Sequence, residues 1–188
     1  MTLATAERLP KAKIPVPCPF GIVVDDREIT GGQWFAFDEG ITSKGSQTAT
    51  VVECVRRRLV TGDYSIVGME HLVTIERKAI SDLWGSLGTG RQRFEEEHER
   101  MAAMVAVGGY CAVVIEGNWG MIARGKPSQS RVHFNSIYGT ACHWSMRYRV
   151  PWWAENGRRD AELRTYRLLE AFWRQYEKRQ QAEGWDAI

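Results

Sequence analysis

The chain has 188 residues, of which 44% are hydrophobic and 26% are charged, and its formal net charge is +2 at pH 7. This length suffices for one well-cored domain, and the charge balance excludes an overwhelming basic field. No apolar run approaches the roughly 20 residues that a membrane span needs. The four cysteines are far apart and form no C-x-x-C pair, which argues against a zinc site. These features predict a cytoplasmic protein without a membrane segment.

Residues 1–17 are predicted to be a flexible arm that three prolines keep extended, and residues 18–188 a single domain. The first half of that domain is predicted to form mainly strands. β-Branched and apolar runs bounded by turn residues favour strands, whereas Gly/Ser/Thr-rich runs favour loops. In chain order we expect a strand at 21–25, a turn at 31–32, an aromatic strand at 34–37, a loop at 38–47, one long strand at 48–60, and a strand at 71–76 that pairs antiparallel with it through a turn at Gly68.

The second half alternates helices with strands, which indicates an α/β domain. Helical stripes of apolar residues and the glycines that interrupt them set the boundaries. We expect a short helix at 82–87 capped by Ser81, a helix at 92–107, a central parallel strand at 110–116, a loop at 118–131, a helix at 133–148, an edge strand at 150–153 and an amphipathic helix at 160–181.

Residues 62–82, GDYSIVGMEHLVTIERKAISD, carry the strongest functional signal. Glu76 and Lys78 fall on the same face of a strand, because side chains alternate with a period of two. Carboxylates that converge on one point can hold Mg²⁺, and a nearby lysine can orient water or offset charge in a transition state. Upstream, the apolar run at 22–24 leads directly into the acidic sequence DDRE. The pattern therefore predicts a metal-dependent phosphodiesterase.

Taken together, VVDDRE, TGDYSI and IERKAISDLWGSLGTGR resemble the XPF-type structure-specific endonuclease domain. The signature V-D-x-R-E followed by G-D-x(n)-E-R-K-x(3)-D is complete here. The resemblance implies an α/β, restriction-endonuclease-like fold, with a mixed central sheet flanked by helices, and residues 18–188 would be the nuclease domain. It implies a catalytic set of Asp25, Arg27, Glu28, Asp63, Glu76, Arg77, Lys78 and Asp82.

Within this set we expect Glu28, Asp63 and Glu76 to bind the metal, Mg²⁺ or Mn²⁺. Asp25 is a further candidate ligand, with orientation of Arg27 or Lys78 as the alternative. Asp26, the variable position of the motif, is expected to point away from the site.

Lys78 is expected to stabilise charge and orient water rather than to act as a general base. Arg77 lies on the opposite strand face, with its side chain tied to an acid such as Asp82. Two interpretations of Asp82 remain open. It either supports the metal ligands without touching the ion, or it is an exposed acid at a helix N-terminus, where the helix dipole favours negative charge. Glu116 ends a central strand near the site and is given no role.

Arg91 and Arg93 flank a glycine-containing loop at a helix start, where arginines and backbone amides can bind phosphate. They are the predicted DNA-binding residues. The arginines at 56–58 lie on a predicted strand, so their side chains must alternate between its two faces. They could contact DNA or form ion pairs at the edge of the sheet.

The sequence thus predicts an endonuclease that cuts DNA, with flaps, forks or junctions as the expected substrates. The alternatives are a catalytically silent DNA-binding or scaffold module and a sequence-specific restriction-type nuclease. A homodimer is also expected, since aromatic residues crowd the last two helices and exposed aromatics favour association: Trp144, Tyr148, Tyr166, Phe172, Trp173 and Tyr176.

Overall fold

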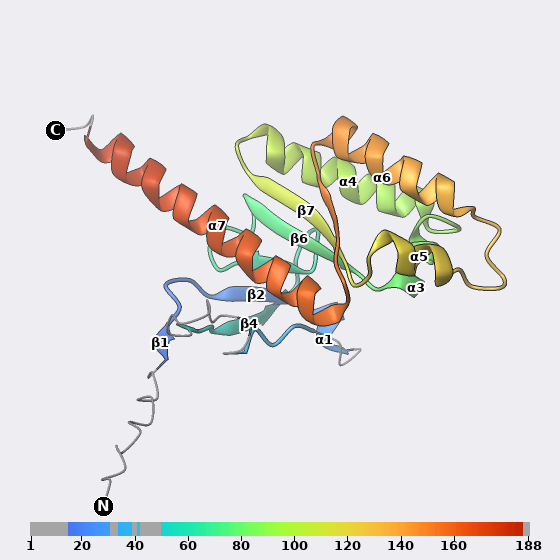
Figure 1. Ribbon diagram of the computed structural model, residues 1–188. Helices are drawn as coiled ribbons and strands as arrows, with labels where there is room; N and C mark the ends of the chain where they lie inside the picture. Colours follow the sequence, from blue (N-terminus) through green and yellow to red (C-terminus); the bar gives the residue numbers. More distant parts are fainter. Residues whose placement is uncertain (1–14, 31–33, 39–40, 42–49, 186–188) are drawn as a thin grey trace, which may run out of the picture.

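The computed structural model of the protein describes residues 15–30, 34–38, 41 and 50–185, and Figure 1 shows a central sheet with helices on both faces. The predicted α/β fold with a mixed, helix-flanked sheet is confirmed. The elements are β1 (Val16–Pro17), β2 (Ile22–Asp25), α1 (Asp26–Thr30), β3 (Thr50–Val51), β4 (Cys54–Arg57), β5 (Tyr64–Ile66), β6 (Val73–Lys78), α3 (Ile80–Ser86), α4 (Arg91–Ala106), β7 (Tyr110–Ile115), α5 (Trp119–Arg124), α6 (Phe134–Tyr148), β8 (Trp152–Ala154) and α7 (Arg158–Trp185).

The main sheet has six strands in the order β4-β2-β5-β6-β7-β8. Only β5 runs against its neighbours; β2 pairs parallel with β4, and β6, β7 and β8 are mutually parallel. The carboxyl ends of β2, β6 and β7 therefore meet at the same edge of the sheet. In open α/β sheets this is the edge where ligands bind.

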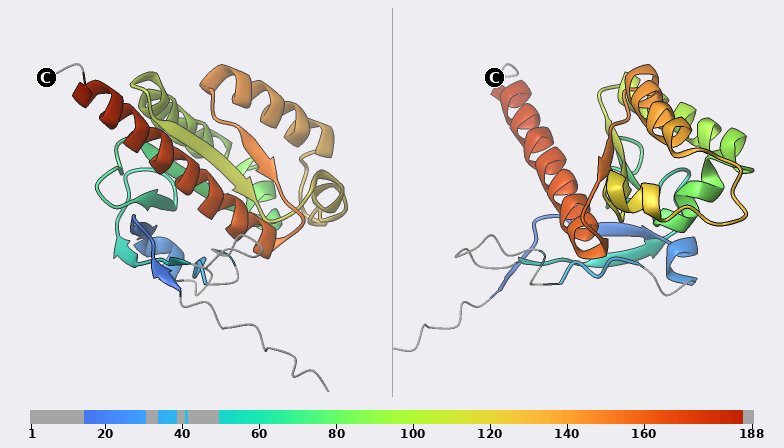
Figure 2. Two further views of the ribbon diagram at one scale, coloured as in Figure 1. Left: turned by 60° about the vertical axis from the view of Figure 1, so that its left-hand side comes forward. Right: turned by 45° about the vertical axis from the view of Figure 1, so that its right-hand side comes forward.

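The sheet separates two hydrophobic cores. On one face, α7 packs with Tyr166 and Leu169 against the strands. On the other face, α3, α4 and α6 enclose a second core that includes Trp84 and Trp144. The two further views show α7 alone on its side of the sheet and the other helices grouped opposite (Figure 2). Strand β7 is apolar throughout and contributes alternate residues to the two cores, as a central strand buried on both faces must.

The β5–β6 hairpin brings Asp63 beside the end of β6. Its turn contains Gly68, whose φ of +84° suits glycine. A second glycine, Gly62, stands immediately before Asp63 with φ of +74°. A Cβ atom built on Gly62 would lie only 2.0 Å from Oγ1 of Thr74, which already bonds the carbonyl of Thr61 at 3.0 Å. The positive φ and the lack of space for a Cβ atom therefore both require glycine at position 62.

The aromatic strand predicted at 34–37 is wrong. Residues 34–38 form no regular structure, because side chains rather than a neighbouring strand satisfy the backbone. The N–H of Phe35 donates to the Tyr64 hydroxyl at 2.9 Å, and the N–H of Phe37 donates to Oε1 of Glu162 at 2.8 Å. The turn predicted at 31–32 and nearly all of the loop at 38–47 lie outside the described residues.

The single long strand predicted at 48–60 is also wrong. Its described part is split into β3, which pairs with β1, and β4, which pairs parallel with β2. The antiparallel partner of β6 is β5, through the register Tyr64↔Ile75. Alternation of β-branched residues identified a strand here but could not identify its neighbour, which depends on contacts distant in sequence.

One predicted helix cap is wrong, and one helix was predicted as a loop. Helix α3 begins at Ile80 after Ala79, and no side chain caps it, so Ser81 is not the cap. The loop predicted at 118–131 contains α5, whose start is capped by Asn118, with its side chain accepting the Met121 N–H at 2.9 Å. The expected helices at 92–107, 133–148 and 160–181 and strands at 110–116 and 150–153 are present as α4, α6, α7, β7 and β8.

The predicted arm falls mostly in residues 1–14, outside the described part, while Val16 and Pro17 form β1. No helix within the described residues combines the length and apolar character needed to cross a membrane.

Exchanging Gly62 for alanine should lower the free energy of unfolding by about 1–3 kcal/mol, because Ala would be strained at this φ and would collide with Thr74. Gly85→Ala is the matched control: Gly85 lies in α3, nothing lies within 4 Å of its Cβ position, and alanine favours a helix. Thermal denaturation followed by circular dichroism compares the two. A Gly62→Ala protein that melts as high as Gly85→Ala would contradict this account of the hairpin.

Candidate active site

A polar cleft lies at the carboxyl ends of β2 and β6, walled by α1, α3 and α4. It collects every predicted site residue except Asp25 and Arg91. The lining residues are Arg27, Glu28, Asp63, Glu76, Arg77, Lys78, Ser81, Asp82, Gly85, Ser86, Thr89, Gly90, Arg93, Phe94 and Glu97.

Asp63 is fixed by the hairpin that carries it. Its Oδ2 accepts the backbone N–H of Arg77 at 2.7 Å, and its own N–H donates to the Ile75 carbonyl at 2.9 Å. Burial raises the pKa of Asp63 well above its usual value, and the nearby charges of Glu76 and Glu28 raise it further. Three carboxylates are thus held close enough to repel one another, and a cation would relieve that repulsion.

Lys78 lies on the same face of β6 as Glu76, as the alternation predicted. Its ammonium group is paired with Oε1 of Glu76 and lies 4.7 Å from the ring centroid of Phe94 on α4. Burial alone would lower the pKa of Lys78, but Glu76, Asp63 and Glu97 outweigh it and raise the pKa. Lys78 therefore stays protonated in this state and supplies positive charge.

Arg77 lies on the opposite face, and its guanidinium is buried between two acids. Its side chain is 4% exposed, with Nε donating to Glu116 at 2.7 Å and Nη1 to Glu28 at 2.9 Å. Glu116 and Glu28 thus take the place expected for Asp82. Asp82 lies exposed in the first turn of α3, within hydrogen-bond distance of Ser81 at 3.4 Å.

Asp25 is fully buried behind the cleft. It accepts Nε of Arg27 at 2.6 Å and the Leu59 N–H at 2.7 Å. Burial alone would raise the pKa of Asp25, but these bonds outweigh it and lower the pKa. Two roles were predicted for Asp25: binding the metal, or orienting Arg27 or Lys78. The observed hydrogen bonds fit the second role, with Arg27 as the oriented residue, and Arg27 itself lines the cleft. Asp26, expected to point away, pairs with Arg58 at 2.6 Å.

Two acids that contact cleft residues, one inside the cleft and one behind it, were not assigned a role by the sequence reasoning. Glu97 on α4 hydrogen-bonds with the Glu76 side chain, and burial together with the Glu76 charge raises the pKa of Glu97 to about 7. Glu97 lies four residues after Arg93, so helical spacing could have placed both on the cleft face. Glu116 follows the register pair Lys78↔Ile115, a position only the strand pairing reveals.

The two predicted DNA-binding arginines point to different places. Arg93 is exposed and lines the cleft. Arg91 packs away from it against α6, with its guanidinium 5.1 Å from the Trp144 ring centroid and a hydrogen bond to Thr140 at 3.0 Å. The arginines at 56–58 are occupied at the sheet edge, where Arg57 pairs with Glu70 at 2.6 Å.

The donor set of the cleft suits a hard divalent cation, since Glu28, Asp63 and Glu76 offer carboxylate oxygens. In the described part of the chain, however, no group of three or more His, Cys, Asp or Glu side chains is already arranged as a metal site. Lys78 and Arg77 now bind the Glu76 and Glu28 carboxylates. Ion binding by all three acids therefore requires the Lys78–Glu76 pair to open, whereas the Arg77–Glu28 pair can remain.

Comparison with solved structures finds the same fold in a nuclease. XPF from Aeropyrum pernix matches with a TM-score of 0.56 and 21% sequence identity, covering 80% of this chain and 60% of that one. The same protein in complex with DNA matches with a TM-score of 0.54 and 21% identity, covering 85% and 66%. The chain thus spans about 60–66% of the length of these structures.

No curated protein matches the sequence. The model of the family described as "ERCC4 domain" does match, over residues 24–161. This range contains the whole predicted motif, from Asp25 to Asp82. Because it covers well over half of the chain, the protein belongs to the ERCC4 domain family.

Proposed function

We propose that this protein is a Mg²⁺- or Mn²⁺-dependent DNA endonuclease that hydrolyses phosphodiester bonds in branched DNA. The observation that carries this proposal is that Glu28, Asp63, Glu76 and Lys78 converge on one cleft from α1, from the turn before β5 and from β6. Membership of the ERCC4 domain family and the likeness to a structure solved with DNA support the choice of substrate. The complete acid set argues against a catalytically silent scaffold.

Each cleft residue has a role in this proposal. Glu28, Asp63 and Glu76 would hold the cation, which supplies Lewis-acid activation of the phosphate and of the attacking water. Lys78, protonated and held beside Glu76, offsets negative charge that develops on the phosphoryl group.

Arginines complete the assignment. Arg93 binds a backbone phosphate at the mouth of the cleft. Arg77 keeps Glu28 in place from behind. Cleavage would leave a 5′-phosphate and a 3′-hydroxyl, as the family resemblance implies.

Single changes in the acid cluster should abolish cleavage while leaving the fold intact. We expect Asp63→Asn and Glu76→Gln to lower the rate of flap-DNA cleavage by orders of magnitude, since the remaining carboxylates cannot position the ion, and we expect EDTA to stop the wild type. Asp160→Asn and Glu99→Gln, at exposed positions on α7 and α4, are the isosteric controls. Cleavage in EDTA, or by Glu76→Gln at the control rate, would overturn the mechanism.

Substitutions of Arg91 and Arg93 should have different effects on DNA affinity and on its salt dependence. In EDTA, Arg93→Ala should weaken DNA affinity and reduce the log–log salt slope by about 0.9, the value for one lost phosphate contact on duplex DNA. Arg91→Ala should leave the slope unchanged and lower the melting temperature, because it removes packing on Trp144. Anisotropy titrations at several salt concentrations measure the slopes; a larger slope change for Arg91→Ala would place the phosphate contact with Arg91.

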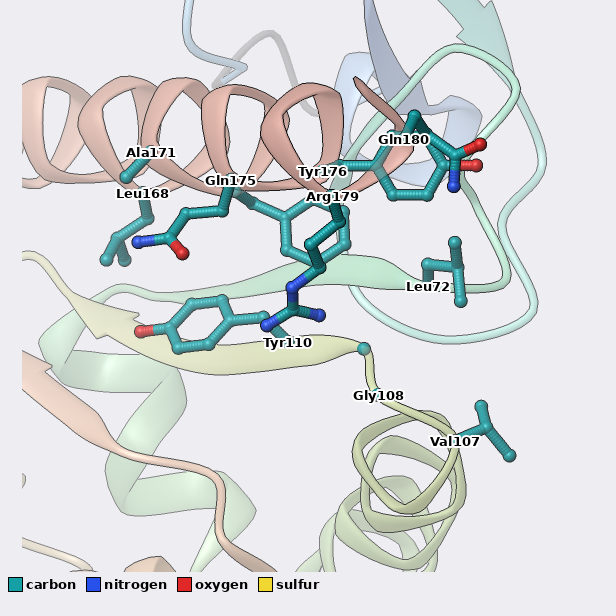
Figure 3. Close-up of a pocket in the computed structure, with 12 residues that line it drawn as sticks. Leu72, Val107, Gly108, Tyr110, Leu168, Ala171, Gln175, Tyr176, Arg179 and Gln180 are labelled. Atoms are coloured by element: carbon teal, nitrogen blue, oxygen red, sulfur yellow. The ribbon is translucent and has the colours of Figure 1, made fainter. Parts of the chain in front are cut away.

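We also propose a homodimer, on a narrower basis than the sequence suggested. Of the aromatics on the last two helices, Trp144, Tyr148 and Tyr166 are buried in the cores, and Trp173 packs partly buried against Phe20, so these four need no partner chain to cover them. Phe172 and Tyr176 instead line an apolar groove on the far half of α7 (Figure 3). Its other lining residues are Leu72, Val107, Gly108, Gly109, Tyr110, Leu168, Ala171, Gln175, Arg179 and Gln180.

A charge placed in this groove should dissociate the dimer. Val107 is 71% exposed at its rim, so Val107→Glu should cost the monomer fold little while opposing apolar association. Val60→Glu, at an 87% exposed valine outside the groove, is the control. Light scattering at micromolar concentration should give twice the 21.4 kDa chain mass for wild type and Val60→Glu, and one chain mass for Val107→Glu. A wild-type mass of one chain would exclude the dimer.

A further inference from the structure

Charge is distributed very unevenly along the chain. Residues 117–154 contain no aspartate or glutamate, although the whole chain has 23 of them. The same residues contain five cations: Arg124, Lys126, Arg131, Arg147 and Arg149. This segment therefore carries more than the entire net charge of +2 and forms α5, α6 and β8.

The start of this segment lies directly behind the wall of the cleft. A Cβ atom on Gly125 would lie 2.8 Å from Cγ2 of Ile80, the first residue of α3, and one on Gly88 would lie 3.6 Å from Cγ2 of Val132. Helix α5 and the chain after it thus run alongside α3 and the α3–α4 loop, which line the cleft on their other side (Figure 1).

Four of the five cations are exposed without an acid partner in the described part of the chain; Arg149 lies at the far end of α6, and the other three lie at the end of α5 and in the chain before α6. Arg124, Lys126 and Arg131 are exposed, and within the described residues none of them forms an ion pair with an acid. By contrast, Arg147 farther along α6 is paired with Glu95 at 3.0 Å. We call the first three residues, with the chain that joins them, the basic edge.

Aromatic rings adjoin the basic edge. Tyr138 on α6 is 46% exposed and packs edge-to-face on Trp119 of α5, with ring centroids 5.0 Å apart. Phe134 supports it from one turn earlier, at 6.1 Å. A supported, half-exposed ring beside unpaired cations is the combination that binds single-stranded nucleic acid, where bases stack and phosphates meet positive charge.

We propose that the basic edge and Tyr138 bind a single-stranded segment of the DNA substrate as it leaves the cleft. This inference rests on the proposed function and goes beyond it, because it assigns a second DNA-binding surface outside the catalytic cleft. Duplex DNA has its bases stacked internally and offers Tyr138 no free base face. The edge therefore selects a single strand, or a flap that contains one, over a blunt duplex.

Binding in EDTA to a labelled single-stranded oligonucleotide, to a flap and to a blunt duplex tests this proposal. Lys126→Ala with Arg131→Ala should reduce the log–log salt slope on the single strand by about 1.4, for two phosphate contacts on single-stranded DNA. Tyr138→Ala should weaken single-strand and flap binding, whereas Tyr138→Phe should retain it. Affinity for the blunt duplex should stay close to wild type in all three variants.

Arg174→Ala with Lys178→Ala removes the same pair of charges from α7 and controls for net charge. An unchanged slope, a loss equal to that of the α7 control, or an equal loss on blunt duplex would overturn the inference. Cleavage of the flap by the wild type with Mg²⁺ is measured separately. Single-strand binding through the edge without cleavage would uphold the inference and overturn the proposed function.

Discussion

The arrangement of the cleft depends on one buried guanidinium. Arg77 joins Glu28 of α1 to Glu116 after β7, and Glu116 in turn accepts Arg158 at the start of α7 at 2.9 Å. Burial alone would lower the pKa of Arg77, but the Glu116 and Glu28 charges outweigh it and raise the pKa, so the charge is retained. Removing one partner of a buried ion pair leaves an uncompensated buried charge. This lowers the free energy of unfolding far more than replacing both partners by apolar residues does. Elements distant in sequence are thereby held at one edge of the sheet.

The same backbone position serves both structure and chemistry. The N–H of Arg77 holds Asp63, while the side chains on either side of it in β6, Glu76 and Lys78, point to the other face and into the cleft. Gly62 allows the close approach of the two strands that makes this bond possible. On the far side of α3 the charge reverses, from the acids of the cleft to the cations of the basic edge.

Much of the cleft was predictable because a period of two and a helical period fix which side chains share a face. Glu76 with Lys78 follows from the strand alone, and the acids after β2 follow from an apolar run that ends in charge. The partners of Arg77 were not predictable, since Glu116 reaches it only through the parallel pairing of β6 with β7. Arg91 and Arg93 look equivalent in sequence, but the packing of α4 on α6 turns Arg91 to Trp144. The segment at 34–37 has strand composition yet is held by Tyr64 and Glu162, which no local pattern reveals.

The most direct test of the central claim is the location of a bound ion by anomalous diffraction from crystals soaked in Mn²⁺. We expect one strong peak within coordination distance of the carboxylate oxygens of Asp63 and Glu76, with the Lys78 ammonium displaced from the Glu76 oxygen that it now holds. Glu28 should approach the same ion, directly or through water. A crystal that shows no peak at saturating Mn²⁺, or a peak that lies away from both Asp63 and Glu76, would contradict the central claim.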